Sequence, residues 1–173
     1  MRYAHTLLTV ALAFGVAIGS ACTRKPPTEP PNTGPGSVKV ARQYLEGRWT
    51  LVSFAVYPPS GAPVTVNATG TLVYDDFGNL TMDLGVDEAG AAVMQKSGIP
   101  VEKGRFTSSG RTIVDMQGRS LRYVLDTPPA VGGQAGPLAM SRPRYWERDG
   151  NTLTLTTKDD NGKPLSVGRW QKQ

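Results

Sequence analysis

Few side chains of this chain could do covalent or metal chemistry. The sequence has one histidine, His5, and one cysteine, Cys22, both near its beginning. Catalytic triads, cysteine–histidine pairs and His/Cys zinc sites need an imidazole or a thiolate, and neither residue type follows Cys22. The sequence also lacks the glycine-rich motifs that bind nucleotide phosphates. We therefore expect no enzyme, no catalytic residues, no metal site and no cofactor.

Paired carboxylates are the remaining candidates for chemistry. Asp75-Asp76 and Asp159-Asp160 each stand shortly before a glycine, and clustered carboxylate oxygens could bind calcium. The spacing of an EF-hand loop is absent, however, and Asp, Asn and Gly are the ordinary residues of tight turns. We interpret both pairs as turn residues.

The residues before Cys22 have the pattern of an export signal. Arg2 gives a short positive start, and residues 6–21 are apolar or small and carry no charge. This run is too short for a comfortable membrane span but suits the middle of a secretion signal. The small residues 19–21 before Cys22 resemble a bacterial lipobox, with glycine where leucine is usual. The pattern predicts a lipoprotein signal peptide over residues 1–21.

Cys22 is the predicted site of lipid attachment. As the sole cysteine it cannot form an internal disulfide, and a leftover thiol in an exported protein needs an explanation. Acylation, with palmitate as one chain, explains it and would hold the protein firmly at a membrane. Residues 22–36 contain five prolines and predict an extended tether. Thr23 follows the cysteine, at the position where an aspartate retains many lipoproteins in the inner membrane. In an organism with two membranes we therefore expect the protein at the outer membrane, with its domain in the periplasm.

The charge of the chain is mildly basic and dispersed. There are 19 lysines and arginines against 14 acidic residues. No basic run with interleaved aromatic residues stands out, so we expect no nucleic-acid partner.

Alternating apolar residues and turn signals dominate the part from residue 37 to 173. Asp149-Gly150 and Asn161-Gly162 separate alternating runs, and such pairs are the strongest short-range hairpin signals. A further hairpin is expected over 104–118, turning near Ser109-Gly110. Short helices are expected over 38–47 and from Glu88 to Lys96.

These signals predict eight or nine strands in one domain, residues 37–173. Successive antiparallel strands must close or leave exposed edges that invite aggregation. We therefore predict an all-β fold, an antiparallel up-and-down barrel preceded by a short helix. A two-sheet β-sandwich is the alternative.

Three stretches resemble a known family. They are LEGRWTLVSFAV (45–56), GTLVYDDFGNLTMDL (70–84) and DGNTLTLTTKDDNGKPLSVGRWQK (149–172). Together they are similar to the lipocalin-like domain of bacterial proteins in the calycin group. The resemblance implies that Trp49, after Gly47, packs at the closed floor of the barrel, under a basic residue of the last strand. Arg169 is the candidate for that residue, with Lys172 as the alternative.

Strand alternation also selects residues that could line a cavity. The inward candidates are Leu72, Tyr74, Leu80, Met82, Leu84, Tyr123, Leu125, Leu153 and Leu155. An eight-stranded barrel is just wide enough to be filled by side chains or to hold one small ligand.

Two functions are compatible with this pattern. The first is a membrane-anchored envelope lipoprotein that binds a small apolar or amphiphilic ligand in its barrel. The second is an interaction or structural module with a filled barrel, which contacts an envelope protein partner through residues 86–100 and 128–139.

Overall fold

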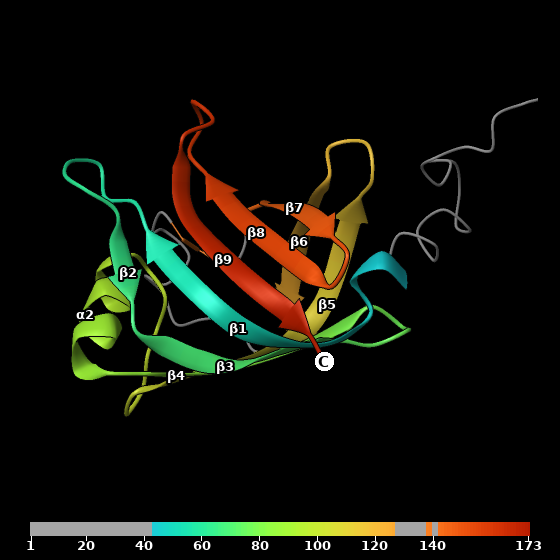
Figure 1. Ribbon diagram of the computed structural model, residues 1–173, viewed down its shortest axis with the longest axis horizontal. Coiled ribbons are helices and arrows are strands. Elements are labelled where there is room, and N and C mark those ends of the chain that lie inside the picture. Colours follow the sequence, from blue (N-terminus) through green and yellow to red (C-terminus); the bar gives the residue numbers. More distant parts are fainter. Residues whose placement is uncertain (1–42, 127–137, 140–141) are drawn as a thin grey trace, which may run out of the picture.

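The computed structural model of the protein describes residues 43–126, 138–139 and 142–173. Figure 1 shows a sheet that curls around a central axis, with one helix at its edge. The strands are β1 (Gly47–Val56), β2 (Val64–Val66), β3 (Ala68–Tyr74), β4 (Asn79–Val86), β5 (Arg105–Asp115), β6 (Ser120–Leu125), β7 (Arg144–Asp149), β8 (Thr152–Lys158) and β9 (Pro164–Lys172); the helix is α2 (Glu88–Lys96).

The described strands form a closed antiparallel barrel. Their order is β2-β1-β3-β4-β5-β6-β7-β8-β9, and β1 also pairs with β9. This last pairing joins the two ends of the sheet, so eight strands close on themselves and β2 is an extra strand beside β1. The predicted all-β up-and-down barrel is confirmed, and the sandwich alternative is wrong because the sheet is continuous.

β1 pairs with neighbouring strands along both of its edges. Its first residues pair with β3, its last residues pair with β2, and its other edge runs along β9. The register with β9 shifts between Leu51 and Ser53. A bulge of this kind increases the local bend and twist, which helps β1 to curve around the barrel.

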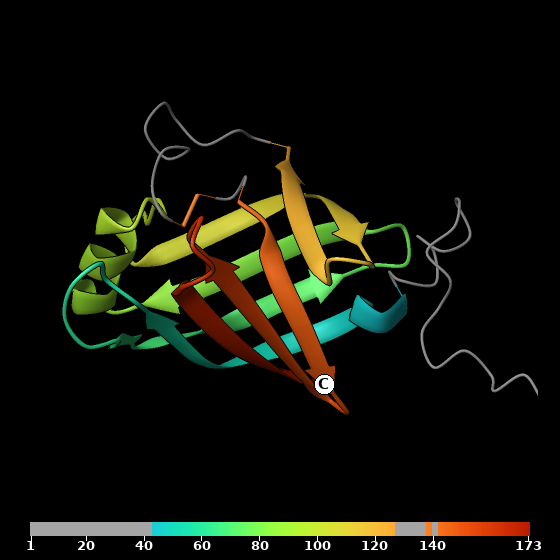
Figure 2. The same cartoon turned by 90° about the horizontal axis from the view of Figure 1, so that it is seen from above.

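The two ends of the barrel are different. Figure 2 shows α2 at one end and the short helical segment before β1 at the other. That segment is helical over 43–45, whereas Glu46 is not helical and Gly47 begins β1, so the helix expected over 38–47 ends two residues early; its residues 38–42 lie outside the described residues. Inside the barrel between these ends lies one continuous core of buried apolar side chains.

The helix α2 begins where its sequence predicts. Asp87 is the N-cap, and its carboxylate accepts a hydrogen bond from the backbone N–H of Gly90 at 2.7 Å. Such a cap satisfies one of the N–H groups that a helix leaves without a partner. The hydrogen bond from Gly90, and a second from the amide of Asn67, lower the pKa of Asp87.

The hairpin expected to turn at Ser109-Gly110 is not formed. β5 continues through these residues, and the chain turns instead at 116–119 before β6. Gly110 is instead required by the close approach of β5 and β6. A Cβ at Gly110 would lie 2.2 Å from the carbonyl oxygen of Val124 on β6, so only glycine allows the two strands to approach so closely.

The β6–β7 seam is the least paired junction of the described barrel. β6 and β7 are in register at only two residue pairs, Ser120↔Tyr145 and Leu121↔Arg144. By contrast, β5 and β6 are paired along the whole of β6. The end of β6 therefore diverges from the start of β7, and Arg144 stands at the point where they part.

Candidate functional site

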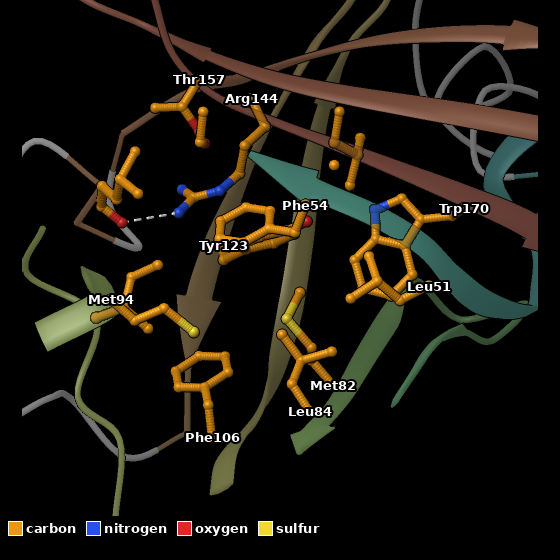
Figure 3. A pocket seen from close by; sticks show the side chains of 15 residues that line it. Leu51, Phe54, Met82, Leu84, Met94, Phe106, Tyr123, Arg144, Thr157 and Trp170 are labelled. Atoms are coloured by element: carbon orange, nitrogen blue, oxygen red, sulfur yellow. Dashed lines mark hydrogen bonds between the residues drawn. The ribbon is translucent and has the colours of Figure 1, made fainter. Parts of the chain in front are cut away.

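The candidate site is a cavity inside the barrel, drawn in Figure 3. Its volume is about 60 Å³, enough for several water-sized groups, since one such group needs roughly 10–15 Å³. Its lining is mainly apolar and comes from both sides of the barrel. The lining residues are Leu51, Phe54, Met82, Leu84, Met94, Ile99, Phe106, Tyr123, Leu138, Arg144, Leu155, Thr157, Ser166, Gly168 and Trp170.

The apolar side of the cavity includes two methionines and a phenylalanine. Met82 comes from β4, Phe106 from β5 and Met94 from α2, and Figure 3 shows them near one another below the open space. Met94 is nearly fully buried, so α2 contributes to the cavity as well as covering one end of the barrel. Methionine side chains are flexible and adapt to the shape of their neighbours.

Arg144 brings a charge into this apolar lining. Its side chain is only 7% exposed, and its guanidinium lies 4.9 Å from the ring centroid of Tyr123. It donates hydrogen bonds to the backbone carbonyls of Leu138, Ala139 and Arg142. Burial lowers the pKa of Arg144, because the charged form is costly away from water. Figure 3 shows the guanidinium near the ring of Tyr123, with its hydrogen bond to the carbonyl of Leu138 as a dashed line.

A pair of tyrosines lies beside Arg144. The hydroxyl oxygens of Tyr74 on β3 and Tyr123 on β6 are 2.9 Å apart in the buried interior. Burial raises the pKa of Tyr74 well above its ordinary value, and it also raises the pKa of Tyr123. Both phenols are therefore neutral at physiological pH, and one hydroxyl can donate to the other.

Polar groups also lie on the β8–β9 side of the cavity. Thr157 and Ser166 are register partners on these strands, and both are buried. Trp170 is 4% exposed, and its indole Nε1 has no hydrogen-bond acceptor among the described residues. The cavity lining thus combines one guanidinium, the phenol of Tyr123, two aliphatic hydroxyls and an indole N–H with an apolar remainder.

The predicted lining residues divide into two groups. Met82, Leu84, Tyr123 and Leu155 line the cavity. The other predicted residues do not line it: Leu72, Tyr74, Leu80 and Leu153 are buried, and Leu125 is half-buried against the same core. Leu72 is the register partner of Trp49, so it belongs to the filled end of the barrel.

Trp49 lies at that filled end. Its side chain is 0% exposed, and its indole Nε1 donates to the carbonyl of Leu45 at 2.8 Å. Lys172 Nζ lies 5.5 Å from the ring centroid, and Arg148 Cζ lies 5.7 Å from it. Gly47 has a φ of 128°, and a Cβ there would lie 2.6 Å from Cε of Lys172, so glycine leaves room for the lysine.

The assignment of Arg169 to this position is wrong. Arg169 is exposed, while its neighbours Gly168 and Trp170 are buried. Arg169 shares strand parity with Leu165 and Val167, whereas the inner face of β9 carries Ser166, Gly168 and Trp170. The alternative, Lys172, is the last-strand cation that lies over Trp49.

Several important lining residues escaped the sequence prediction. Arg144 was one of them, although it shares strand parity with Trp146, which is an inward-facing aromatic residue. Trp170 lies in the last stretch that carries the family resemblance (149–172), and that resemblance assigns it no place in the cavity. Trp170 shares the inner face of β9 with Ser166 and Gly168. Because these two residues are small and not apolar, hydrophobic alternation did not identify that face.

The acidic pairs behave as turn residues. The carboxylate of Asp75 accepts hydrogen bonds from the backbone N–H groups of Phe77 and Asn79, and Asp159 accepts from those of Asn161 and Lys163. No group of three or more His, Cys, Asp or Glu side chains that could hold a metal ion occurs within the described ranges.

The predicted lipid-attachment residue Cys22 lies outside the described residues, as does most of segment 128–139. None of the helices in the described part of the chain has the length and apolar character needed to cross a membrane. No protein-family model matches the chain, and no curated protein matches it.

Proposed function

We propose that this protein is an exported, lipid-anchored member of the lipocalin-like group that binds a small apolar or amphiphilic molecule inside its barrel. One observation carries the proposal: the closed barrel contains a cavity of about 60 Å³ with a mainly apolar lining. A barrel that served only as a scaffold would gain stability by filling this space, since interiors normally pack without voids.

The size and lining of the cavity define the ligand. A small ring or a short acyl chain would bury its apolar surface against Leu84, Phe106 and Leu155, at roughly 25 cal/mol for each Å² removed from water. Movement of Met82 and Met94 would extend the space for a longer chain. The filled Trp49 end would set the depth to which such a ligand enters.

The anchor and the location belong to the same proposal. The resemblance of residues 19–21 to a lipobox, and the position of Cys22 as the only cysteine, support acylation at that residue. In a cell with two membranes, the barrel would lie in the periplasm and hang from the outer membrane by the proline-rich tether.

Ligand binding can be tested with a variant that fills the cavity. Ser166 is buried in the lining, whereas Ser53 is exposed on β1, so Ser166→Phe and Ser53→Phe form a matched pair. The full chain, isolated from the envelope in which it is made, is examined by native mass spectrometry and titrated with octanol. Tryptophan fluorescence is the readout because Trp170 lines the cavity.

We expect a co-purifying mass and an octanol response in the natural chain and in Ser53→Phe. Both signals should be lost in Ser166→Phe. A natural chain with no added mass and no octanol response would contradict ligand binding, and reproducible crosslinking to an envelope protein would then favour the filled-barrel interaction module.

A further inference from the structure

We propose that Trp170 selects ligands that carry a neutral acceptor oxygen, such as that of a ketone or an ether, by donating a hydrogen bond from its indole N–H to that oxygen inside the cavity. This inference rests on the proposed function, because it names the chemical class that the same cavity would bind. It makes Trp170 a specificity-determining residue of the site.

The indole N–H of Trp170 is a buried donor without an acceptor. Trp170 is 4% exposed and lines the cavity, and its Nε1 has no hydrogen-bond partner in the described part of the chain. An indole N–H can only donate, and leaving such a donor unsatisfied inside a protein is costly. A molecule that enters the cavity with an acceptor oxygen would remove this cost.

The other two tryptophans of the chain are placed differently. Nε1 of Trp49 donates to the carbonyl of Leu45 at 2.8 Å, so its burial leaves no donor unsatisfied. Nε1 of Trp146 is buried without an acceptor among the described residues, but Trp146 does not line the cavity. Trp170 therefore combines two properties that neither of the others has together, an unsatisfied N–H and a place in the cavity wall.

Gly168 leaves space beside the indole nitrogen of Trp170. A Cβ at Gly168 would lie 3.0 Å from Nε1 and 3.7 Å from Cε2 of that indole, so a side chain at this position would crowd the edge of the ring that carries the N–H. Gly168 itself lines the cavity. In Figure 3 the indole nitrogen lies on the side of the ring nearer Phe54. A ligand in the cavity can therefore approach this edge of the indole.

The surroundings of the N–H favour a neutral oxygen over a charged one. Leu51 is the register partner of Trp170, and Phe54 is the register partner of Gly168. Both side chains are apolar and line the cavity, and burying a full charge beside them would be costly. A carbonyl or ether oxygen needs only the one hydrogen bond that the indole offers. The carbon skeleton of the ligand would then lie against the apolar remainder of the lining.

The test compares cyclohexanone with methylenecyclohexane as ligands of the full chain. In methylenecyclohexane a CH₂ group replaces the oxygen of cyclohexanone, so the two rings have nearly the same shape but only the ketone can accept a hydrogen bond. Calorimetry measures both affinities. Their ratio is determined within each variant, so a loss of stability affects both ligands alike.

Two tryptophan variants assign the selectivity. Trp170→Phe removes the N–H and keeps an aromatic ring in the wall, and the ratio of ketone to hydrocarbon affinity should fall about threefold to tenfold, as expected for one hydrogen bond between neutral groups. Trp146→Phe is the matched control and should leave the ratio unchanged. An unchanged ratio in Trp170→Phe, or an equal fall in both variants, would overturn the inference.

A second measurement keeps Trp170 in place and serves also if Trp170→Phe does not fold. The three tryptophans of the chain give separate indole N–H signals in a proton–nitrogen correlation spectrum. Cyclohexanone should move the Trp170 signal downfield more than methylenecyclohexane does. The Trp49 signal should stay in place, because its N–H is bonded to Leu45. Equal displacement of the Trp170 signal by both ligands would contradict the hydrogen bond.

Failure of this inference differs from failure of the proposed function. A chain that binds octanol but shows no response to cyclohexanone, or no role of Trp170 in distinguishing the two rings, would overturn the inference and leave the proposed function intact. A chain that binds neither octanol nor either ring would overturn both.

Discussion

Tyr74 and Tyr123 place their hydroxyl oxygens 2.9 Å apart and thereby connect β3 with β6, two strands that are not neighbours in the sheet. The bond crosses the interior between the filled end and the cavity. The buried phenol pair is stable only while both hydroxyls keep their protons. The free energy of unfolding of the barrel should therefore decrease at alkaline pH.

The first prediction concerns that dependence. Both folded-state pKa values are raised above the ordinary value of 10, so the stabilisation is complete below pH 10 and is lost as pH rises toward the folded-state values. Urea unfolding should show a decline on the order of 1 kcal/mol per pH unit for each group. Tyr74→Phe removes one member of the pair and should reduce this slope. A slope unaffected by Tyr74→Phe would contradict the role of the pair.

The second prediction concerns the floor. Trp49→Ala removes a fully buried indole and its hydrogen bond to Leu45, and should lower the free energy of unfolding by about 3–5 kcal/mol. Trp49→Phe retains most of the apolar contact and should cost less. Chemical denaturation followed by circular dichroism measures both. Equal losses for the two variants would show that ring volume is not the stabilising property.

The third prediction concerns the contact between β5 and β6. Gly110→Ala would bring a methyl group against the carbonyl of Val124 and should destabilise the barrel by about 1–3 kcal/mol. Gly85→Ala is the control within the same sheet, because its new methyl group would meet only ordinary contacts at 3.7 Å and beyond. Thermal unfolding of both variants makes the comparison. A stable Gly110→Ala variant would mean that the strands separate easily at this point.

The fourth prediction concerns the membrane anchor. Radiolabelled palmitate should enter the natural chain in a cell that processes lipoproteins, and the label should be absent from Cys22→Ser. Fractionation should find the natural chain in the membrane and the variant in the soluble fraction. Equal labelling of both proteins would refute acylation at Cys22.

Local signals predicted most of the fold. Asp149-Gly150 and Asn161-Gly162 fixed the last two turns, and the alternation of leucine with threonine fixed β8. These features depend on residues close in sequence, where turn chemistry and strand period act directly. The burial of Trp49 was instead expected from the family resemblance that the Gly47-to-Trp49 stretch carries.

Two errors have one physical origin, which is contact with a distant strand. Ser109-Gly110 has the composition of a turn, but Gly110 is required by the approach of β6. On β9, Gly168 lies on the inner face, where a Cβ would lie 3.0 Å from Nε1 of Trp170 and 3.6 Å from Cδ2 of Phe54, so glycine leaves room for these rings. At both positions, groups from distant parts of the chain leave no room for a side chain. Hydrophobic alternation along one strand does not report such contacts.

Arg144 could not be placed from sequence for a related reason. An arginine at the start of a strand is usually solvated. Its burial follows from the divergence of β6 and β7, which opens a space beside Tyr123, and from the backbone carbonyls of 138–139 and 142 that surround it. These are tertiary features with no local pattern.

The pairing of β1 with β9 has a consequence for biosynthesis. The strand that completes the cylinder is the last one of the barrel to be translated, so every earlier folding intermediate exposes two unpaired edges. Joining strands so far apart in the chain is entropically expensive and slow. If the chain is exported as proposed, the nascent polypeptide would remain open while it passes through the membrane, and the barrel would close only after the final hairpin has been made.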